Sequence, residues 1–584
     1  MANPILLMRE GDMPYQPISI ASMEWNKTGN WRYLRPRFDN KVPPCNEGCP
    51  AGQDIEGAMV LIGKGRFLEA WELFKQENPF PAVCGRVCYH PCESSCNRGD
   101  FDEPLSINAL ERFMADMASK HGRRLSRKRE KRPEKIAVIG SGPAGLTCAY
   151  HLARMGYGVT VFEALPVLGG MLRVGIPEYR LPKKVLEEEI DQILELGVKA
   201  EINTRLGGNL SLGDLKEFQA LFVALGNHQS KSLGIPGEEA REIMSGVEFL
   251  RDVSLGKEVA LGKRVAVIGG GNTAIDAARS ALRLGAKPNI LYRRTREEMP
   301  AFPGEILEAE EEGIEISFLV SPVRVMGENG KVKQLECIKN RLGPPDEDGR
   351  RRPVEIKGSN FSLEVDQIIS AIGEEADLSP LPKKLMAKDH TILTDERGAT
   401  KQAGMFAGGD IIQQPRTVVH AIGSGKRTAI FIDCLLKDQK WEGLFEALRV
   451  GEKGSLSMKR YLQEEGERAP LSSKTVRLQD LNLDYFDYQK RPKMPKAKAS
   501  RRTGSFGEVN LGFSEEMAVG EAKRCFNCGV CNLCDNCYIF CPDVAIHKRG
   551  EDELNEIDYE HCKGCGICME ECPRDVIVME EEGR

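Results

Sequence analysis

Long apolar segments and a strong net charge are both missing from this 584-residue sequence. No run of eighteen apolar residues is free of charge, so we predict no membrane span. The net charge is only −6, whereas nucleic-acid binding favours a basic face. The first residues become acidic and polar too early for a secretory signal. We therefore expect a cytoplasmic protein with several domains and no nucleic-acid partner.

Cysteine, in contrast, is abundant: the sequence has nineteen, in two groups. Six lie within 45–96 and ten within 525–572. Disulfides are rare in a reducing compartment, so these groups indicate metal binding. The remaining three, Cys148, Cys337 and Cys434, are isolated, and we expect them to pack in hydrophobic cores.

The last sixty residues contain the spacing C-x2-C-x2-C-x3-C-P twice, as CNLCDNCYIFCP (531–542) and CKGCGICMEECP (562–573). This is the bacterial ferredoxin run, in which the fourth cysteine of each run binds the cluster of the other run. A structural zinc site would require the eight cysteines to pair differently. The predicted ligands of the two [4Fe-4S] clusters are Cys531, Cys534, Cys537 and Cys572 for one, and Cys562, Cys565, Cys568 and Cys541 for the other.

Cys525 and Cys528 extend the first run upstream as CFNCGVC. They are spare thiols, alternative ligands, or a ligand pair for a cluster elsewhere in the fold or on a partner.

A nucleotide-binding pattern occupies 135–164, KIAVIGSGPAGLTCAYHLARMGYGVTVFEA. An apolar strand leads into G-x-G-x-x-G, and a helix and a second strand follow. The first glycine makes the turn, the second admits a pyrophosphate and the third allows close helix packing. The helix N-terminus attracts the phosphates. Glu163 follows at the distance where an acid binds a ribose hydroxyl.

The pattern recurs at 264–294 as Gly269, Gly271 and Ala274. The position that matches Glu163 is Arg293, with Arg294 beside it. Arginine suits a 2′-phosphate, which favours NADP(H) over NAD(H) without excluding the latter. The alternative is two exposed arginines that bind no ligand.

Two such folds in one chain suggest one site for FAD and one for the nicotinamide. We assign FAD to the first, because the chain returns to it through GMFAGGD (404–410) and a predicted helix at 417–436. This return would place Asp410 beside the ribityl chain and the helix N-terminus near the flavin.

Several motifs within 41–436 together resemble one family: CNEGCPAGQDI, NPFPAVCGRVCYHPCESSCNRG, GSGPAG, GGMLRVGIPEYRLP, GGGNTAIDAAR, YRRTREEMP and AGGD. The chain is similar to the small subunit of glutamate synthase and to the N-terminal half of dihydropyrimidine dehydrogenase. It also resembles the large subunit of the bifurcating NADH-dependent ferredoxin:NADP oxidoreductase. Glutamate synthase small subunits have no ferredoxin tail, which argues against glutamate synthesis as the role. The 584 residues also contain no glutaminase domain and no FMN barrel, so any carbon chemistry would lie on another subunit.

The resemblance and the motifs together imply two nucleotide sites. The expected FAD residues are Gly140, Ser141, Gly142, Pro143, Ala144, Gly145, Glu163, Gly169, Gly170, Met171, Gly409, Asp410 and Thr417. The expected NAD(P) residues are Gly269, Gly270, Gly271, Asn272, Thr273, Arg293 and Arg294.

The resemblance also implies [4Fe-4S] clusters in an N-terminal helical domain. One would use Cys49, Cys88, Cys92 and Glu111. A second would include Cys45 and Cys96, but the two further cysteines that the family has upstream of Cys45 are missing here. We therefore expect one or two N-terminal clusters, and we expect Cys84 to be a packing residue.

The predicted fold is a multidomain α/β protein, with a helical iron–sulfur domain, two Rossmann-like domains and an α+β ferredoxin-like domain. The expected boundaries are 1–40 for an arm that lies on a partner or on its own domain, 41–130 for the helical domain, 131–262 plus 373–436 for the FAD domain, 263–372 for the NAD(P) domain, 437–515 for a linker and 516–584 for the ferredoxin domain. The stretch 489–504 contains no acid, which favours an extended, self-repelling tether. The alternative is docking of an acidic partner.

These features predict an NAD(P)H:acceptor oxidoreductase that exchanges electrons with ferredoxin or another oxidoreductase subunit. Candidate partners are a 2-oxoacid oxidoreductase, a sulfite-reductase-type enzyme, a glutamate synthase large subunit or free ferredoxin. Hydride transfer needs positioning rather than an acid or base, so we expect no catalytic residues and assign no such role to His151, His228 or His420. The alternative is a redox sensor or scaffold without turnover.

Overall fold

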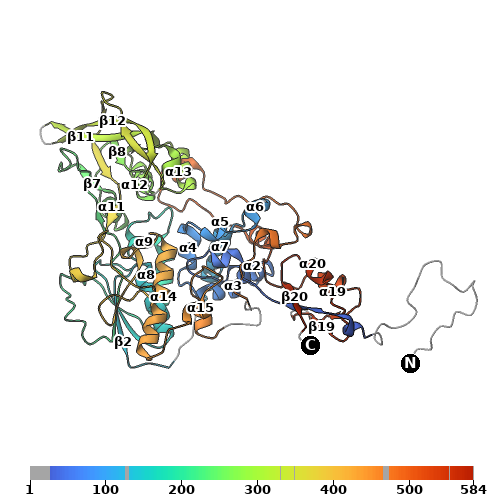
Figure 1. Ribbon diagram of the computed structural model, residues 1–584. Helices are drawn as coiled ribbons and strands as arrows, with labels where there is room; N and C mark the ends of the chain where they lie inside the picture. Colours follow the sequence, from blue (N-terminus) through green and yellow to red (C-terminus); the bar gives the residue numbers. More distant parts are fainter. Residues whose placement is uncertain are drawn as a thin grey trace, which may run out of the picture.

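The computed structural model describes residues 27–124, 130–328, 331–346, 349–464, 472–550 and 553–582. Figure 1 shows two α/β domains at one end of the molecule, a helical domain in the middle and a small C-terminal domain at the other end. Within the described part, no helix has the length and apolar character needed to cross a membrane.

The helical domain consists of short helices around a core that it shares with the first α/β domain. Proline occupies the first turn of three of them, where its missing N–H costs nothing. α4 and α7 pack so closely that a side chain at Gly85 would lie 2.4 Å from the backbone of Arg112. The helices are α1 (Pro44–Glu47), α2 (Ile55–Gly63), α3 (Phe67–Lys75), α4 (Pro81–Val87), α5 (Pro91–Ser94), α6 (Arg98–Phe101) and α7 (Ile107–Lys120).

The first α/β domain contains a parallel sheet in the order β17-β5-β2-β3-β4. The strands are β2 (Lys135–Ile139), β3 (Gly158–Phe162), β4 (Lys199–Glu201), β5 (Ala220–Val223) and β17 (Met405–Ala407). The helices are α8 (Pro143–Arg154), α9 (Met171–Val174), α10 (Lys183–Leu194) and α14 (Val418–Leu436). The chain returns to this domain as predicted, with β17 at the sheet edge and α14 packed on α8.

The second α/β domain has a parallel sheet in the order β10-β9-β8-β15-β7. Its strands are β7 (Ile243–Ser245), β8 (Arg264–Ile268), β9 (Lys287–Tyr292), β10 (Glu315–Phe318) and β15 (Gln367–Ser370), and its helices are α11 (Gly246–Ser254), α12 (Asn272–Arg283) and α13 (Pro303–Glu311). An antiparallel sheet is inserted as β11 (Val320–Glu328), β12 (Lys331–Pro345), β13 (Arg351–Glu355) and β14 (Phe361–Glu364). The two crossings between the domains pair as β6 (Gln229–Ser230) and β16 (Glu374–Glu375).

The second domain begins earlier than the expected residue 263. β7 pairs with β15, and α11 follows β7 directly. The strand is only three residues long, which is too short to give a recognisable apolar pattern.

The C-terminal domain contains α18 (Glu515–Lys523), α19 (Asn536–Ile539), β18 (Ile546–His547), β19 (Glu556–Ile557), α20 (Ile567–Glu570) and β20 (Ile577–Glu581). Its last strand pairs antiparallel with β1 (Leu34–Phe38). The arm expected at 1–40 therefore lies on its own chain over the part that the structure describes, residues 27–40. Trp31 in this part is exposed, whereas Trp25 lies outside the described residues.

The segment expected as a solvated tether is docked instead. Within 489–504, Lys496 pairs with Glu308 at 2.7 Å and Arg502 pairs with Glu311 at 2.5 Å, both on α13. The basic residues meet an acidic helix of the same chain, so they do not repel one another into an extended form. The segment 437–515 contains α15 (Leu444–Leu448), α16 (Met458–Tyr461) and α17 (Ala499–Arg502).

Candidate functional site

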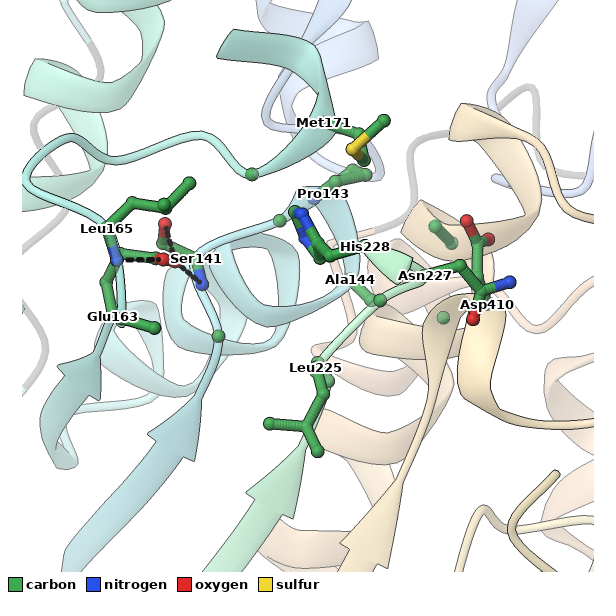
Figure 2. A pocket seen from close by; sticks show the side chains of 18 of the residues that line it. Ser141, Pro143, Ala144, Glu163, Leu165, Met171, Leu225, Asn227, His228 and Asp410 are labelled. Atoms are coloured by element: carbon green, nitrogen blue, oxygen red, sulfur yellow. Dashed lines mark hydrogen bonds between the residues drawn. The ribbon is translucent and has the colours of Figure 1, made fainter. Parts of the chain in front are cut away.

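A cavity of about 380 Å³ opens at the carboxyl ends of β2, β3 and β5. Ligands of open α/β sheets bind at this edge. Most of the expected FAD residues line the cavity: Gly140, Ser141, Gly142, Pro143, Ala144, Glu163, Gly170, Met171, Gly409, Asp410 and Thr417. Figure 2 shows Glu163 and Ser141 on one side of it and Asp410 on the other, with Pro143 and Ala144 between them.

The three glycines of the first motif have different structural roles. Gly140 has a φ of 102°, and a side chain there would lie 2.3 Å from the carbonyl oxygen of Ala224. A side chain at Gly145 would lie 1.9 Å from the carbonyl oxygen of Gly140. A side chain at Gly142 would meet no atom within 4 Å. Gly140 and Gly145 therefore set the turn and the helix packing, while Gly142 leaves the open face that a pyrophosphate needs.

Glu163 is buried at the end of β3 and is held by the glycine loop. Its carboxylate accepts hydrogen bonds from the Ser141 amide (2.9 Å), the Ser141 hydroxyl (2.6 Å) and the Leu165 amide (2.8 Å). The Ser141 hydroxyl also accepts one from the Gly169 amide at 3.0 Å. This network fixes the acid where a ribose would bind, and it assigns Gly169 to support of the loop rather than to the cavity lining.

The other end of the cavity is formed where the chain returns. Burial raises the pKa of Asp410 to about 6, with Arg416 opposing and Glu374 adding to the shift. The Gly409 amide donates to the hydroxyl of Ser424 on α14 at 2.9 Å. Thr417 caps the same helix, so its N-terminus faces the cavity beside Asp410.

Sequence reasoning missed the cavity wall that follows β5. Asn227 and His228 line the cavity there, and Figure 2 shows both beside it. Burial lowers the pKa of His228. Their only sequence signal was their position directly after a buried strand. His151 is buried in α8 and contacts the Glu77 carbonyl oxygen at 3.2 Å, whereas His420 bonds the Thr417 hydroxyl at 2.8 Å.

The second nucleotide motif has the same strand–turn–helix form. Gly269 has a φ of 145°, and a side chain at Gly271 would meet only Pro300, at 4.0 Å. The Asn272 side chain accepts a hydrogen bond from the Phe302 amide at 3.1 Å. The Thr273 hydroxyl donates to the Glu374 carboxylate at 3.1 Å. Because Glu374 also lines the first cavity, this bond joins the two nucleotide domains beside it.

The two expected arginines differ in their surroundings. Arg293 is exposed at the end of β9. Arg294 is buried, donates to the Arg351 carbonyl oxygen at 2.7 Å and pairs with Asp346 at 2.5 Å. Arg294 therefore has a structural role, and Arg293 is the exposed member of the pair.

The first N-terminal set, defined as Cys49, Cys88, Cys92 and Glu111, comes together inside the helical domain. The Cys49 thiol bonds Gln53 at 3.4 Å, and Gln53 donates to Glu111 at 2.9 Å. Burial raises the pKa of Glu111 to about 8. Burial and then the neighbouring Cys49, Cys88 and acids raise the pKa of Cys92 well above its usual value. A [4Fe-4S] core fits the chemistry of this set, because three thiols and one carboxyl supply four ligands and the positive charge of the core would favour their deprotonated forms.

The two ferredoxin sets are arranged as the spacing predicts. Burial, followed by Cys531, Cys572 and Cys534, raises the pKa of Cys537 to about 11, against a hydrogen bond from Asn555. The second set is Cys562, Cys565, Cys568 and Cys541, which line one small cavity.

The two halves of this domain are also alike in detail. The Cys541 sulfur accepts from the Ala545 amide at 3.2 Å, and the Cys572 sulfur accepts from the Val576 amide at 3.5 Å. Both bonds span four residues, and such N–H···S contacts suit cluster thiolates.

The isolated cysteines and Cys84 are buried in apolar cores. Among the described residues, no three or more His, Cys, Asp or Glu side chains are drawn together as a single-ion site requires. All nineteen cysteines lie among the described residues, and none of them forms a disulfide there.

Three family models match the chain. Pyridine nucleotide-disulphide oxidoreductase matches residues 134–425, dihydropyrimidine dehydrogenase domain II (4Fe-4S cluster) matches 38–123, and a 4Fe-4S binding domain matches 555–578.

Curated relatives cover most of the chain. The NADP(+)-dependent formate dehydrogenase subunit beta of Moorella thermoacetica is 41% identical over 83% of this chain and 70% of its own length. The NADPH-Fe(3+) oxidoreductase subunit beta of Geobacter sulfurreducens is 39% identical over 84% and 76%. The glutamate synthase [NADPH] small chain of Escherichia coli is 35% identical over 66% and 87%.

The chain belongs to the pyridine nucleotide-disulphide oxidoreductase family, in the branch that carries 4Fe-4S domains on either side of the nucleotide domains. The predicted resemblance, the fold class and the oxidoreductase function are confirmed. Its cofactors are FAD, a nicotinamide dinucleotide and [4Fe-4S] clusters.

Proposed function

We propose that this chain is the electron-transfer subunit of a multi-subunit oxidoreductase that exchanges electrons between NADP(H) and a protein partner. The observation that carries the proposal is the combination, in one chain, of the flavin cavity, a second nucleotide motif beside it and cysteine sets that continue to the far end of the molecule. When bound, FAD would take a hydride from the nicotinamide and release the electrons singly to iron–sulfur clusters.

The residues at the flavin cavity bind and position. Glu163 would hold the ribose, Gly142 and the α8 N-terminus the pyrophosphate, and Asp410 the ribityl chain. The N-terminus of α14 directs a partial positive charge at the flavin. Arg293 would bind the 2′-phosphate of NADP(H). No side chain is required as an acid or base for hydride transfer, so binding geometry carries the reaction.

The exposed end of the ferredoxin domain is our proposed exit. Cys565 is exposed, unlike the buried Cys568. Apolar side chains next to this set are also exposed, with fractions of 66% for Ile539, 49% for Phe540 and 55% for Val544. A contiguous exposed apolar patch indicates an interaction surface, so a partner would approach here.

The names of the relatives favour another oxidoreductase subunit as the partner. Each of them is named as one subunit or chain of a formate dehydrogenase, an NADPH-Fe(3+) oxidoreductase or a glutamate synthase. We propose either a catalytic subunit of a larger oxidoreductase or free ferredoxin as the partner.

The test is anaerobic mixing of the purified chain with NADPH while the flavin and cluster absorbance are followed. We expect rapid loss of flavin absorbance, then cluster reduction and reduction of added viologen or ferredoxin. Flavin that stays oxidised with both NADPH and NADH would instead support the redox-sensor alternative.

The exit surface has its own test. Phe540→Ser should slow reduction of ferredoxin at least several-fold and leave flavin reduction by NADPH unchanged, because the substitution lies far from the flavin. The control is Leu511→Ser, at an apolar residue that is at least as exposed as Phe540 and lies outside the proposed surface. Equal effects of both variants on ferredoxin reduction would contradict the placement.

A further inference from the structure

Four cysteines outside the three sets described above meet between the helical domain and the C-terminal segment. Cys45 lies on α1, Cys96 follows α5, and Cys525 and Cys528 follow α18. All four line one small enclosed cavity. Its volume, about 20 Å³, equals that of the cavity among the second ferredoxin set.

The four thiols are close enough to interact electrostatically. Burial, and then Cys525, Cys96 and Cys528, raise the pKa of Cys45 well above its usual value. Burial raises the pKa of Cys528 to about 12, with Asn97 opposing and Cys96 adding to the shift. Apolar side chains such as Ile55, Met59 and Phe526 surround the four thiols, so the set is shielded from water while its sulfur atoms face one shared cavity.

Two of these sulfur atoms accept hydrogen bonds from N–H groups. The Asn97 side chain donates to Cys528 at 3.5 Å, and the Asn527 amide donates to Cys525 at 3.4 Å. N–H···S bonds of this kind stabilise thiolate ligands and tune cluster potentials. They match the contacts at Cys541 and Cys572 in the ferredoxin sets.

The C-terminal cysteine pair is held on the helical domain by buried polar contacts. The Arg98 guanidinium donates to the Arg524 carbonyl oxygen at 2.6 Å and stacks on Phe526, with its carbon 4.5 Å from the ring centre. The Ser106 amide donates to the Glu521 carboxylate at 2.7 Å. Asn527 donates to Glu56 at 3.0 Å. Buried contacts therefore hold residues 521–527 against the helical domain, although the paired residues are more than 400 positions apart in the chain.

We propose that Cys45, Cys96, Cys525 and Cys528, here called the shared set, hold a further [4Fe-4S] cluster whose ligands come equally from the two ends of the chain. This inference adds to the proposed function and assigns a role to the two cysteines upstream of the ferredoxin run. The C-x2-C pair at 525–528 takes the place of the cysteines missing upstream of Cys45.

Each half of the shared set is close in sequence to ligands of another set. Cys45 and Cys49 are four residues apart, as are Cys92 and Cys96, so this set and the first N-terminal set use neighbouring turns. Cys528 and Cys531 are three residues apart, at most about 11 Å of extended chain. A cluster here would supply a one-electron carrier between the first N-terminal set and the ferredoxin sets.

The test uses the full chain purified without oxygen, with iron, acid-labile sulfide and zinc measured per chain and with EPR spectra of the reduced protein. The variants are Cys45→Ala, Cys525→Ala and the two combined. Each single variant should lose about four of about sixteen irons, together with the same EPR component. The combined variant should lose no more, because both changes remove one cluster.

Three results would overturn the proposal. They are full iron content in Cys525→Ala, loss of different EPR components in the two single variants, and about one zinc per chain that disappears with Cys525. Cys337→Ala, at a buried cysteine in a separate core, is the control and should keep all its iron.

If Cys45→Ala does not fold, Cys96→Ser replaces it as the variant that removes a ligand near the N-terminus, and its iron content and EPR spectrum are compared with those of Cys525→Ala. Flavin content and flavin reduction by NADPH are measured on the same samples. These should be unchanged in every variant, so a failure of the proposed function is seen separately from a failure of the shared set.

Discussion

We predict that the choice between NADPH and NADH depends on one exposed side chain, Arg293. It stands at the end of β9, where the ribose of a bound dinucleotide would lie. Its neighbour Arg294 is not available, because it is buried and paired with Asp346 at 2.5 Å. Replacing Arg293 by glutamate should therefore change the preference for NADPH over NADH, whereas a change at Arg294 should mainly destabilise the domain.

The magnitude follows from the lost contact. A hydrogen bond to a charged group contributes about 1.5–3 kcal/mol, and each 1.4 kcal/mol is tenfold in affinity. Arg293→Glu should thus weaken NADPH binding by about tenfold to 150-fold. NADH lacks the 2′-phosphate, so its affinity should change by less than about threefold on the same grounds.

The assay is stopped-flow reduction of the bound flavin over a range of NADPH and NADH concentrations without oxygen. Arg296→Glu is the matched control, since Arg296 lies three residues further on, is exposed and pairs with Glu310 on the surface. It should leave the NADPH to NADH ratio unchanged. If Arg293→Glu also leaves the ratio unchanged, or weakens both nucleotides equally, the 2′-phosphate does not bind at the end of β9.

Three further predictions concern the flavin domain and its contact with the helical domain. Gly142→Ala should fold with stability within about 0.5 kcal/mol of the parent, because its methyl meets no protein atom, yet purify with much less FAD by absorbance. Lys426 is fully buried and pairs with Glu77 at 2.6 Å, so Lys426→Met should cost about 3–5 kcal/mol in a denaturation experiment. Lys135→Met, at an exposed pair, should cost less than about 1 kcal/mol. Burial holds the pKa of His151 well below its ordinary value, so only the unfolded chain takes up this proton as the pH falls through about 6.5. Stability should then fall by up to about 1.4 kcal/mol per pH unit below 6.5, and His151→Gln should flatten that part of a melting-temperature profile; an unchanged slope would contradict it.

Local patterns predicted the parts of the site that depend on local backbone geometry. The glycine turn, its following helix and Glu163 lie within thirty residues of one another, and each has a steric or electrostatic reason to be that residue type. The ligands in the two ferredoxin runs could be predicted equally well, because the cysteines that bind [4Fe-4S] clusters in such runs have a fixed spacing. The return of β17 and α14 was also predicted, from the apolar strand before Gly409 and Asp410.

Contacts between distant segments were not predictable in the same way. Asn227 and His228 enter the cavity only because β5 lies next to β2 in the sheet. The basic residues near 496–502 looked solvated, since nothing local shows that α13 presents Glu308 and Glu311 to them. The contact between Cys525 and Cys45 likewise depends on the tertiary fold, and the sequence alone favoured spare thiols or alternative ligands over a ligand pair for another cluster.

The position of the ferredoxin domain decides how electrons would leave the helical domain. A ferredoxin domain on a free tether would have to dock before each electron transfer. This domain is instead held in place by the N-terminal segment of the same chain. β1 pairs along β20, the Lys41 amide donates to the Gly529 carbonyl oxygen at 2.7 Å, and the Lys41 side chain pairs with Asp575 at 2.5 Å. The Lys41 side chain is only 4% exposed, so salt would screen this attachment weakly. The distances between the cysteine sets are therefore set by the fold, and added salt should alter exchange with an external partner more than transfer within the chain.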